Sequence, residues 1–268
     1  MVISTIFVLG SLLLILTTVI RRGLPALNLA MLTQIPKGGY YLGKEGGILN
    51  AILGSLCLAG GATLLAITFS LPVSLYLTLY PFSPLLKNWI HLSLDVLWGI
   101  PSIVYGAFGF SVMLFLGMRA SLLGGIIVLA ILEFPIMVRG MEEAIRMVPA
   151  ELIESSYALG ATRLETSIKV IVKQTLPGLV TAVLLASGRG IGDAASVIFT
   201  AGYTDHLPSS LLRPVASLPL AIFFQLGTPF PAVQDRAYAA ALVLTVIVLG
   251  LSISSRMLSL RFTKNIIR

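Results

Sequence analysis

Two arginines lie within or at the edge of long apolar segments, and each has a carboxylate three or four residues further on. Arg189 precedes Asp193 in the string Ser-Gly-Arg-Gly-Ile-Gly-Asp, and Arg139 precedes Glu142. Residues at these spacings share one face of a helix, so each pair can neutralise its own charge. A guanidinium group offers a planar fork of donors that suits phosphate or sulfate. We therefore predict that these four residues line a path for an anion. The alternative is a structural ion pair, at a helix crossing for Arg189 and at a membrane surface for Arg139.

The segments that hold these side chains are too apolar for a water-soluble domain. Of 268 residues, 57% are hydrophobic and 11% are charged, whereas soluble domains contain about 25% charged residues. The apolar residues gather into runs of about 20 or more, the length that crosses a hydrocarbon core about 30 Å thick. The net charge of +7 would indicate nucleic-acid binding in a soluble protein, but here most basic residues lie near the ends of apolar runs. Membrane orientation explains them better, so we predict a protein embedded in a lipid bilayer, with no nucleic-acid partner.

We predict an all-α integral membrane fold, with one transmembrane domain over residues 1–268 and six spanning helices. The predicted spans cover approximately residues 2–20, 47–79, 88–117, 120–138, 174–201 and 237–256. Gly99-Ile100-Pro101 interrupts the third span, and we expect this break to face inward, because irregular backbone at membrane depth needs protein or a water-filled cavity around it. Glu133 is the only ionisable residue of the fourth span, and its role stays open. Five prolines between residues 202 and 235 argue against a crossing helix there, so we expect a loop with a short interfacial helix.

Six spans place both termini on one side of the membrane. The C-terminal residues Arg256, Arg261, Lys264 and Arg268 form a basic tail, which indicates that this side is the cytoplasm. The 139–173 segment then also faces the cytoplasm, although Arg21 and Arg22 on the other side oppose the charge rule. We expect a multi-pass protein with both termini cytoplasmic.

Residues 139–173 differ from the rest of the chain, with five acidic and five basic residues in 35 positions. A helix-prone stretch begins after Pro149, and Gly160 marks a turn, so two short helices at about residues 142–165 fit the pattern. Rigid helices can pass a push to the spans that they continue into. We predict that this element docks into a cytoplasmic partner; a solvated loop is the alternative.

The chain carries no motif for catalysis or metal binding. No Gly-x-x-x-x-Gly-Lys-[Ser/Thr] string occurs, so we expect no ATPase site in it. His91 and His206 are the only histidines and Cys57 is the only cysteine, a set with neither metal-ligand spacing nor a disulfide framework. We predict no catalytic residue, no metal and no cofactor in this chain.

The segment around Gly160 resembles the coupling-helix signature of ABC-importer permeases, which reads Glu-Ala-Ala, three residues, Gly, nine residues, Ile, one residue, Leu-Pro. Glu154, Gly160 and Val170 fall at the matching places. The two alanines are serines here, and Leu176-Pro177 comes four residues later than in the signature. The resemblance implies that this chain meets an ATPase through Glu154, Tyr157, Ala158, Gly160 and Ala161.

Several strings resemble the A-type permease of bacterial phosphate importers. They are Gly99-Ile-Pro-Ser-Ile-Val-Tyr-Gly106, Glu142-Glu-Ala-Ile-Arg-Met-Val-Pro149, Ser155-Ser-Tyr-Ala-Leu-Gly-Ala-Thr162, Arg189-Gly-Ile-Gly-Asp193, Phe199-Thr-Ala-Gly202 and Arg236-Ala-Tyr-Ala-Ala-Ala-Leu-Val243. They cover the third to sixth predicted spans, and the resemblance extends more loosely to the Gly-rich loop at 38–47. The family often has Glu-Thr-Ala-Pro after the arginine, where this chain has Asp193-Ala-Ala-Ser196. The missing proline leaves the bend of the fifth span open.

This resemblance implies a type I ABC-importer permease in the bacterial cytoplasmic (inner) membrane, which forms half of a path for inorganic phosphate by alternating access. It also implies four partners: a second homologous permease, two ATP-binding cassette subunits that bind ATP and Mg²⁺, and an external phosphate-binding protein. In that family the arginines matching Arg139 and Arg189 are associated with phosphate passage.

Other functions stay open on the sequence. Within the ABC class they are the sister phosphate permease and a permease for sulfate, molybdate or tungstate. An ion-driven secondary transporter would show inverted repeats, and an intramembrane enzyme would need a nucleophile and a base within the spans.

Overall fold

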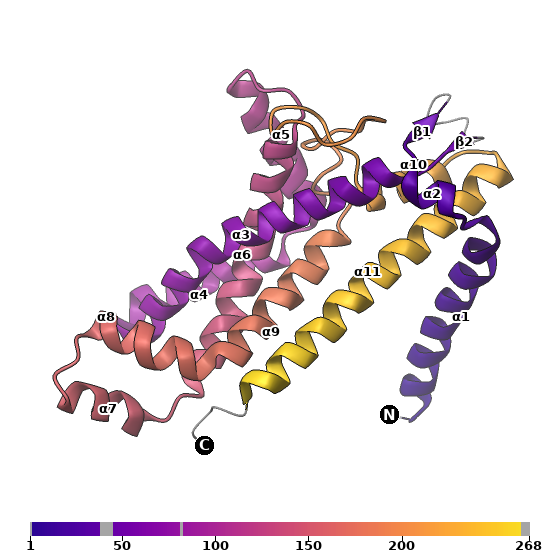
Figure 1. Cartoon of the computed structure of the whole chain (residues 1–268). Coiled ribbons are helices and arrows are strands. Elements are labelled where there is room, and N and C mark those ends of the chain that lie inside the picture. The colour runs from indigo at the N-terminus through magenta and orange to yellow at the C-terminus, as the bar shows by residue number, and fades with distance from the viewer. Residues whose placement is uncertain (1, 38–44, 81–82, 264–268) are drawn as a thin grey trace.

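The computed structural model describes residues 2–37, 45–80 and 83–263, which are mostly helical (Figure 1). The helices are α1 (Val2–Ala26), α2 (Leu29–Thr33), α3 (Leu49–Leu79), α4 (Pro84–Gly99), α5 (Ser102–Phe115), α6 (Leu122–Arg146), α7 (Ala150–Ala158), α8 (Arg163–Glu165), a π-helical segment (Thr166–Ile171), α9 (Val172–Ile191), α10 (Leu218–Leu226) and α11 (Pro231–Thr263). Two short strands, β1 (Pro36–Lys37) and β2 (Glu45–Gly46), pair antiparallel. Residues 38–44 of the Gly-rich loop, and Lys264 and Arg268 of the basic tail, lie outside the described residues.

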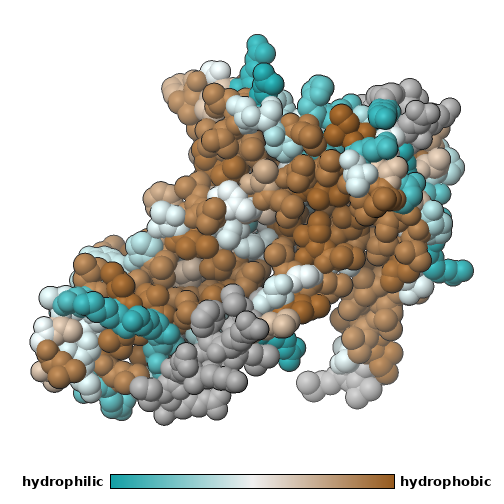
Figure 2. Space-filling view, viewed as in Figure 1, coloured by the Kyte–Doolittle hydropathy of each residue, from teal (hydrophilic) through white to brown (hydrophobic). Residues whose placement is uncertain are grey.

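Among the described residues, five helical stretches are long and apolar enough to cross a membrane: α1, α3, α6, α11, and α8 to α9 taken together. The pair α4 and α5 forms a sixth candidate span, bent by 98°. Apolar side chains cover most of the visible face, with hydrophilic residues gathered at its upper edge and lower left (Figure 2). The predicted class, an all-α integral membrane fold, is confirmed.

The bend between α4 and α5 lies at the predicted break. Pro101 lacks a backbone N–H and favours an extended conformation in the residue before it, and Ile100 has φ −68° and ψ 131°. The expectation that the break faces the interior holds only for its middle residue in this chain: Ile100 packs against the core, whereas Gly99 and Pro101 are exposed.

Helix α6 lies at the centre and packs against α3, α4, α5 and α9. Small residues line its crossing with α9: Gly140 faces Ala182, and Gly178 faces Ala144. Such residues let two membrane helices approach closely. At the edge of the molecule, α1 packs along α11 and exposes its apolar side chains (Figure 1).

The segment between α9 and α11 folds back onto the start of α6. The backbone N–H groups of Ser121, Leu122 and Leu123 donate to the carbonyls of Thr200, Arg213 and Leu211, each at 2.8 Å. The short helix expected within residues 202–235 is α10. One face of it is buried against α3 and α11, where Leu218, Leu220 and Ala221 are all 0% exposed, and Phe223 on the other face is 57% exposed.

Two predicted boundaries are wrong. Helix α6 continues to Arg146, so residues 142–146 belong to the fourth spanning helix and the short helices begin only at Ala150. Helix α9 ends at Ile191 rather than at residue 201. Its last turn contains several glycines, which weaken a helix, and the Oδ2 atom of Asp193 accepts the backbone N–H of Ser196 at 2.8 Å, which favours a turn instead.

Replacement of Gly54 by alanine is expected to destabilise the fold. An added Cβ would lie 1.8 Å from the backbone oxygen of Ala216, and overpacking costs about 1–3 kcal/mol. The control is Gly60→Ala on the same helix, where an added Cβ has no atom within 4 Å. Thermal unfolding in detergent should show a lower melting temperature for Gly54→Ala only. Equal melting temperatures would contradict the close packing of α3 against residue 216.

Candidate functional site

A cluster of ionisable side chains joins α4 to α6, and we call it the α4–α6 cluster. Its members are His91 and Asp95 of α4, and Arg139, Glu142 and Arg146 of α6. The spacings of three and four residues within each helix bring the side chains to one face. The cluster therefore combines the predicted pair Arg139 and Glu142 with three residues that the sequence analysis had not assigned to it.

Arg139 is bound mainly by α4. Its Nε and Nη2 atoms donate to Oδ1 of Asp95 at 3.0 and 2.5 Å, and Nη2 also donates to the carbonyl of His91 at 3.2 Å. Its Nη1 atom lies 2.7 Å from Nδ1 of His91 and 3.9 Å from Oε2 of Glu142. The predicted partner Glu142 is thus the more distant of the two carboxylates, and every nitrogen of this guanidinium group has a partner.

Glu142 is the buried centre of the cluster, since only 1% of its side chain is exposed. Its Oε1 atom accepts a hydrogen bond from Nη2 of Arg146 at 2.6 Å and lies 3.3 Å from Nε2 of His91. A guanidinium group can only donate, so Nδ1 of His91 is the acceptor toward Arg139. The imidazole N–H is then on Nε2, which lies near Oε1 of Glu142 but forms no hydrogen bond.

Sequence reasoning missed His91, Asp95 and Arg146. One available signal was the spacing of four residues between His91 and Asp95 inside a predicted span, where any ionisable residue is a functional candidate. The pairing across two helices depends on how they cross, which no spacing along one helix reveals.

Arg189 occupies the last turn of α9 and is exposed. In the part of the chain that the structure describes, its guanidinium group forms neither a hydrogen bond nor an ion pair. The predicted pairing with Asp193 is wrong: the helix ends before Asp193, whose carboxylate instead accepts the N–H of Ser196. Arg189 therefore presents unpaired donors, while Asp193 shapes the turn behind it.

The two arginines lie at different depths along α6. Gly190, next to Arg189, is in direct contact with the carboxyl group of Glu133 on α6. Arg139 is six residues further along that helix, which corresponds to about 9 Å at 1.5 Å per residue. The structure thus arranges the arginines one after the other rather than in a single site.

The α7–α8 segment, residues 150–165, consists of two short helices joined by a turn at Gly160, whose φ is +81°. Thr162 caps α8 in a reciprocal arrangement with Glu165. Glu154, Tyr157, Ala158 and Gly160 are exposed and Ala161 is partly buried. Leu159 is 89% exposed and Leu164 is 63% exposed. The segment therefore exposes two large apolar side chains beside the residues predicted to meet an ATPase.

This segment is tied to the spans by the packing of Leu152 and Ile153 against the core and by two contacts of polar side chains. The hydroxyl oxygens of Ser156 on α7 and Thr166 on the π-helical segment are 2.9 Å apart. The guanidinium group of Arg163 lies over the ring of Tyr80, at the end of α3, with 5.5 Å to the ring centroid.

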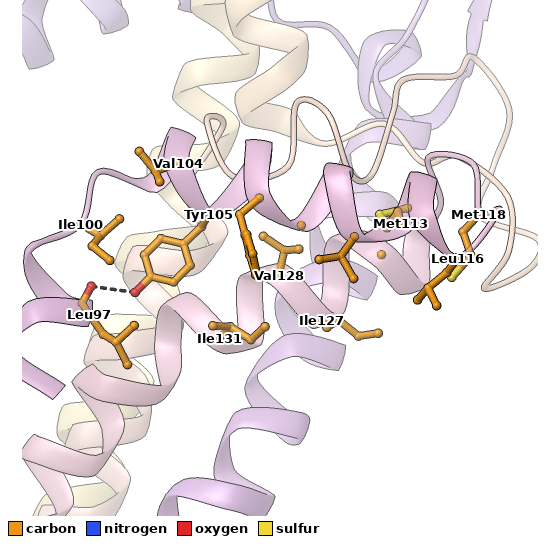
Figure 3. Close-up of a pocket in the computed structure, with 14 residues that line it drawn as sticks. Leu97, Ile100, Val104, Tyr105, Met113, Leu116, Met118, Ile127, Val128 and Ile131 are labelled. Atoms are coloured by element: carbon orange, nitrogen blue, oxygen red, sulfur yellow. Dashed lines mark hydrogen bonds between the residues drawn. The ribbon is translucent and has the colours of Figure 1, made fainter. Parts of the chain in front are cut away.

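A cavity of ≈ 510 Å³ lies between α4, α5 and α6 (Figure 3). Its lining is apolar, including Ile100, Val104 and Ile131, and none of its 14 lining residues is charged. The hydroxyl of Tyr105 donates to the carbonyl of Leu97 at 2.7 Å, so its polar end is satisfied within the wall. This cavity suits lipid chains or an apolar helix rather than an anion.

Comparison with known proteins gives relatives over most of the chain. A family model described as "Binding-protein-dependent transport system inner membrane component" matches residues 70–264. The phosphate transport system permease protein PstA of Yersinia pestis is 32% identical over 255 residues, covering 95% of this chain and 86% of the relative. PstA 1 of Mycobacterium tuberculosis (strain ATCC 25618 / H37Rv) is 34% identical over 215 residues, covering 80% of this chain and 70% of the relative.

Solved structures show the same fold at lower identity. A chain of the MetNI methionine ABC transporter in an inward-facing conformation has a TM-score of 0.66 and 20% identity, covering 80% of this chain and 95% of that one. A chain of a bacterial alginate ABC transporter has a TM-score of 0.62 and 16% identity, covering 99% of this chain and 98% of that one. With the fold, the family match and the PstA relatives in agreement, the chain belongs to the family of inner-membrane components of binding-protein-dependent transport systems.

Proposed function

We propose that this chain is the transmembrane permease subunit of an ATP-driven importer of inorganic phosphate, and that it forms half of the translocation path by alternating access. The PstA relatives, at 32–34% identity over most of the chain, support phosphate as the solute. The structural observation that carries the proposal is Arg189, a guanidinium group on a spanning helix without a partner in the described chain.

The proposed assembly contains a second homologous permease, two ATP-binding cassette subunits and an external phosphate-binding protein. The ATPase subunits bind ATP and Mg²⁺, and this chain contributes neither a catalytic residue nor a cofactor site. Its whole length forms one transmembrane domain with both termini in the cytoplasm. The α7–α8 segment then faces the ATPases.

Passage of the anion uses the two arginines in turn. Arg189, with free donors, offers the first weak contact for an oxyanion. Arg139 is held by Asp95 and His91 in this conformation, so it can bind an anion only after Asp95 moves away. Glu142 and Asp95 limit the positive field at this second position. Weak contacts suit transport, because tight binding would slow release.

Movement of the ATPase subunits is transmitted to the spanning helices through the α7–α8 segment. A displacement of α7 acts on the π-helical segment through Ser156 and Thr166 and thereby on α9. A displacement of α8 acts on α3 through Arg163 and Tyr80. Helices α3 and α9 both pack directly against α6. A displacement of the α7–α8 segment therefore reaches α6 and α9, the helices that carry Arg139 and Arg189.

Arg189→Gln is expected to lower uptake of labelled phosphate by about 10- to 100-fold, the loss of one hydrogen bond to a charged group. The control is Arg213→Gln, the same change at an exposed position outside the helices. Uptake is measured in vesicles with the reconstituted complex, and assembly is checked by co-purification. Normal uptake would refute the path role of Arg189, while failed assembly would favour a structural role. Labelled sulfate in parallel separates phosphate from other oxyanions.

Glu142→Gln is expected to destabilise the protein by about 1–3 kcal/mol, because a buried carboxylate is lost from beside Arg146 and His91. Glu143→Gln is the matched control. Its side chain is 68% exposed, and exposed ion pairs contribute about 0–1 kcal/mol. Thermal unfolding in detergent checks the difference. Similar effects of both changes would show that the α4–α6 cluster does not depend on its buried carboxylate.

A cysteine at Leu159 is expected to cross-link to the ATPase subunit. The native Cys57 is exposed, so it is first replaced by serine. Leu159→Cys then presents a single thiol on the α7–α8 segment, and Leu212→Cys, 68% exposed in the segment before α10, is the control at the opposite end. A thiol-reactive cross-linker applied to the assembled complex should link only the first variant. No link at Leu159 would exclude docking through this segment.

A further inference from the structure

Glu133 lies in the middle of α6, where α3, α6 and α9 meet, and it is 0% exposed. The Oγ1 atom of Thr63 on α3 lies 3.1 Å from its Oε2 atom. Within the described residues no cation is paired with this carboxyl group, and its Oε1 atom has no hydrogen-bond partner. A charge at this place would be buried without compensation, which is costly.

A count of hydrogen atoms shows that keeping all three contacts around Thr63 together requires a hydrogen on the carboxyl group. The hydroxyl of Ser187 on α9 donates to the carbonyl of Val183 at 2.7 Å, and a hydroxyl has one hydrogen to give. The contact of 2.9 Å between Thr63 and Ser187 therefore takes its hydrogen from Thr63. The contact between Thr63 and Glu133 then needs a hydrogen from the carboxyl group.

An ionised Glu133 would cost this chain one hydrogen bond. Thr63 would donate to the carboxylate, and Ser187 could then donate to Thr63 only by giving up its bond to the carbonyl of Val183. With a protonated carboxyl group, Oε2–H of Glu133 donates to Thr63, Thr63 donates to Ser187, and Ser187 donates to the backbone. Every hydroxyl in the chain is then satisfied.

The same carboxyl group supports the end of α9. A Cβ added to Gly190 would lie 2.0 Å from Oε1 of Glu133, so the backbone at Gly190 rests directly on the carboxyl group. Arg189 is the preceding residue, and α9 ends one residue after Gly190, at Ile191. The last turn of α9, which carries Arg189, thus contacts Glu133 directly through Gly190. It is also linked to Glu133 through the hydroxyl groups of Ser187 and Thr63.

We propose that Glu133 is a protonated positioning residue, which seats the last turn of α9 and so fixes where Arg189 meets the anion. This inference rests on the proposed role of Arg189 in the path. A neutral acid suits the position, because a buried charge without a paired cation is costly. Glu133 acts by shape and hydrogen bonding and carries no charge during transport.

The test compares two replacements that separate shape from ionisation. Glu133→Gln keeps the length and a donor at the same place, and it is expected to retain uptake within about twofold, since a neutral donor is all that Thr63 requires. Glu133→Asp keeps an ionisable carboxyl group but is one methylene shorter, and uptake should fall by about tenfold or more with the lost hydrogen bond. The reverse order, with Asp active and Gln inactive, would overturn the proposal.

Positioning is separated from a general loss of structure by two further measurements. Phosphate moved per ATP hydrolysed should fall for Glu133→Asp in complexes that assemble normally, whereas a purely structural defect would lower uptake and ATPase activity together. Gly190→Ala should lower uptake by about tenfold, an overpacking cost of roughly 1.4 kcal/mol, because of its clash with Glu133. Gly188→Ala on the other side of Arg189, with no atom within 4 Å of an added Cβ, should have no such effect. Equal effects of Gly190→Ala and Gly188→Ala on uptake would contradict the proposed contact between Glu133 and the last turn of α9.

Failure of this inference can be told from failure of the proposed function. If the Arg189→Gln variant transports phosphate normally, the role of Arg189 in the path is refuted, and so is the positioning role of Glu133. If Arg189→Gln is defective but Asp at position 133 transports as well as Gln does, only the positioning role is refuted.

Discussion

The need to satisfy backbone hydrogen bonds away from water is the constraint on which the rest of this structure depends, because an unpaired N–H or C=O in hydrocarbon is strongly unfavourable. The first N–H groups of α6 donate to carbonyls of the segment that follows α9. The carbonyl of Leu97, where α4 ends, accepts the hydroxyl of Tyr105. The N–H of Ser196, just past α9, donates to Asp193. At these places the chain leaves the helical conformation with a partner supplied by another element or, at the end of α9 beside Arg189, by a nearby side chain.

Much of the helical framework follows from the sequence, because it depends on local properties. Apolar runs longer than a bilayer give the spanning helices, Pro101 gives the bend, and Gly160 gives the turn between two short helices. The candidate site is less accessible. A spacing of three or four residues reports a shared face of one helix, and so it correctly brings Arg139 near Glu142, but the shorter contacts of Arg139 come from α4. The predicted pairing of Arg189 with Asp193 required the helix to continue through Asp193, but α9 ends two residues earlier, at Ile191.

The two arginines illustrate two ways in which a membrane protein keeps a cation within or beside its spans. Arg139 is surrounded by acceptors from two helices, which fix its direction and reduce its field. Arg189 has no such shell in the described chain, and its position depends on the neutral contacts of its neighbours with α6. Packing of small residues against a buried neutral acid can fix the position of an arginine without reducing its positive field. An ion pair fixes the position and reduces the field at the same time. The similar folds of importers with other solutes, at 16–20% identity, are consistent with a shared framework in which such local details differ.

The π-helical segment between α8 and α9 has a consequence for the phase of the helix that follows it. Its i→i+5 bonds accommodate about one residue more in a turn than an α-helix does, and one residue corresponds to a rotation of about 100°. The face of α9 that meets α6 through Gly178 and Ala182, and the direction in which Arg189 points, are therefore both set by the number of residues in this short link. An insertion or deletion of a single residue there would turn the whole helix relative to its neighbours, so the length of the link is restrained as well as its buried side chains, Thr166 and Ile171.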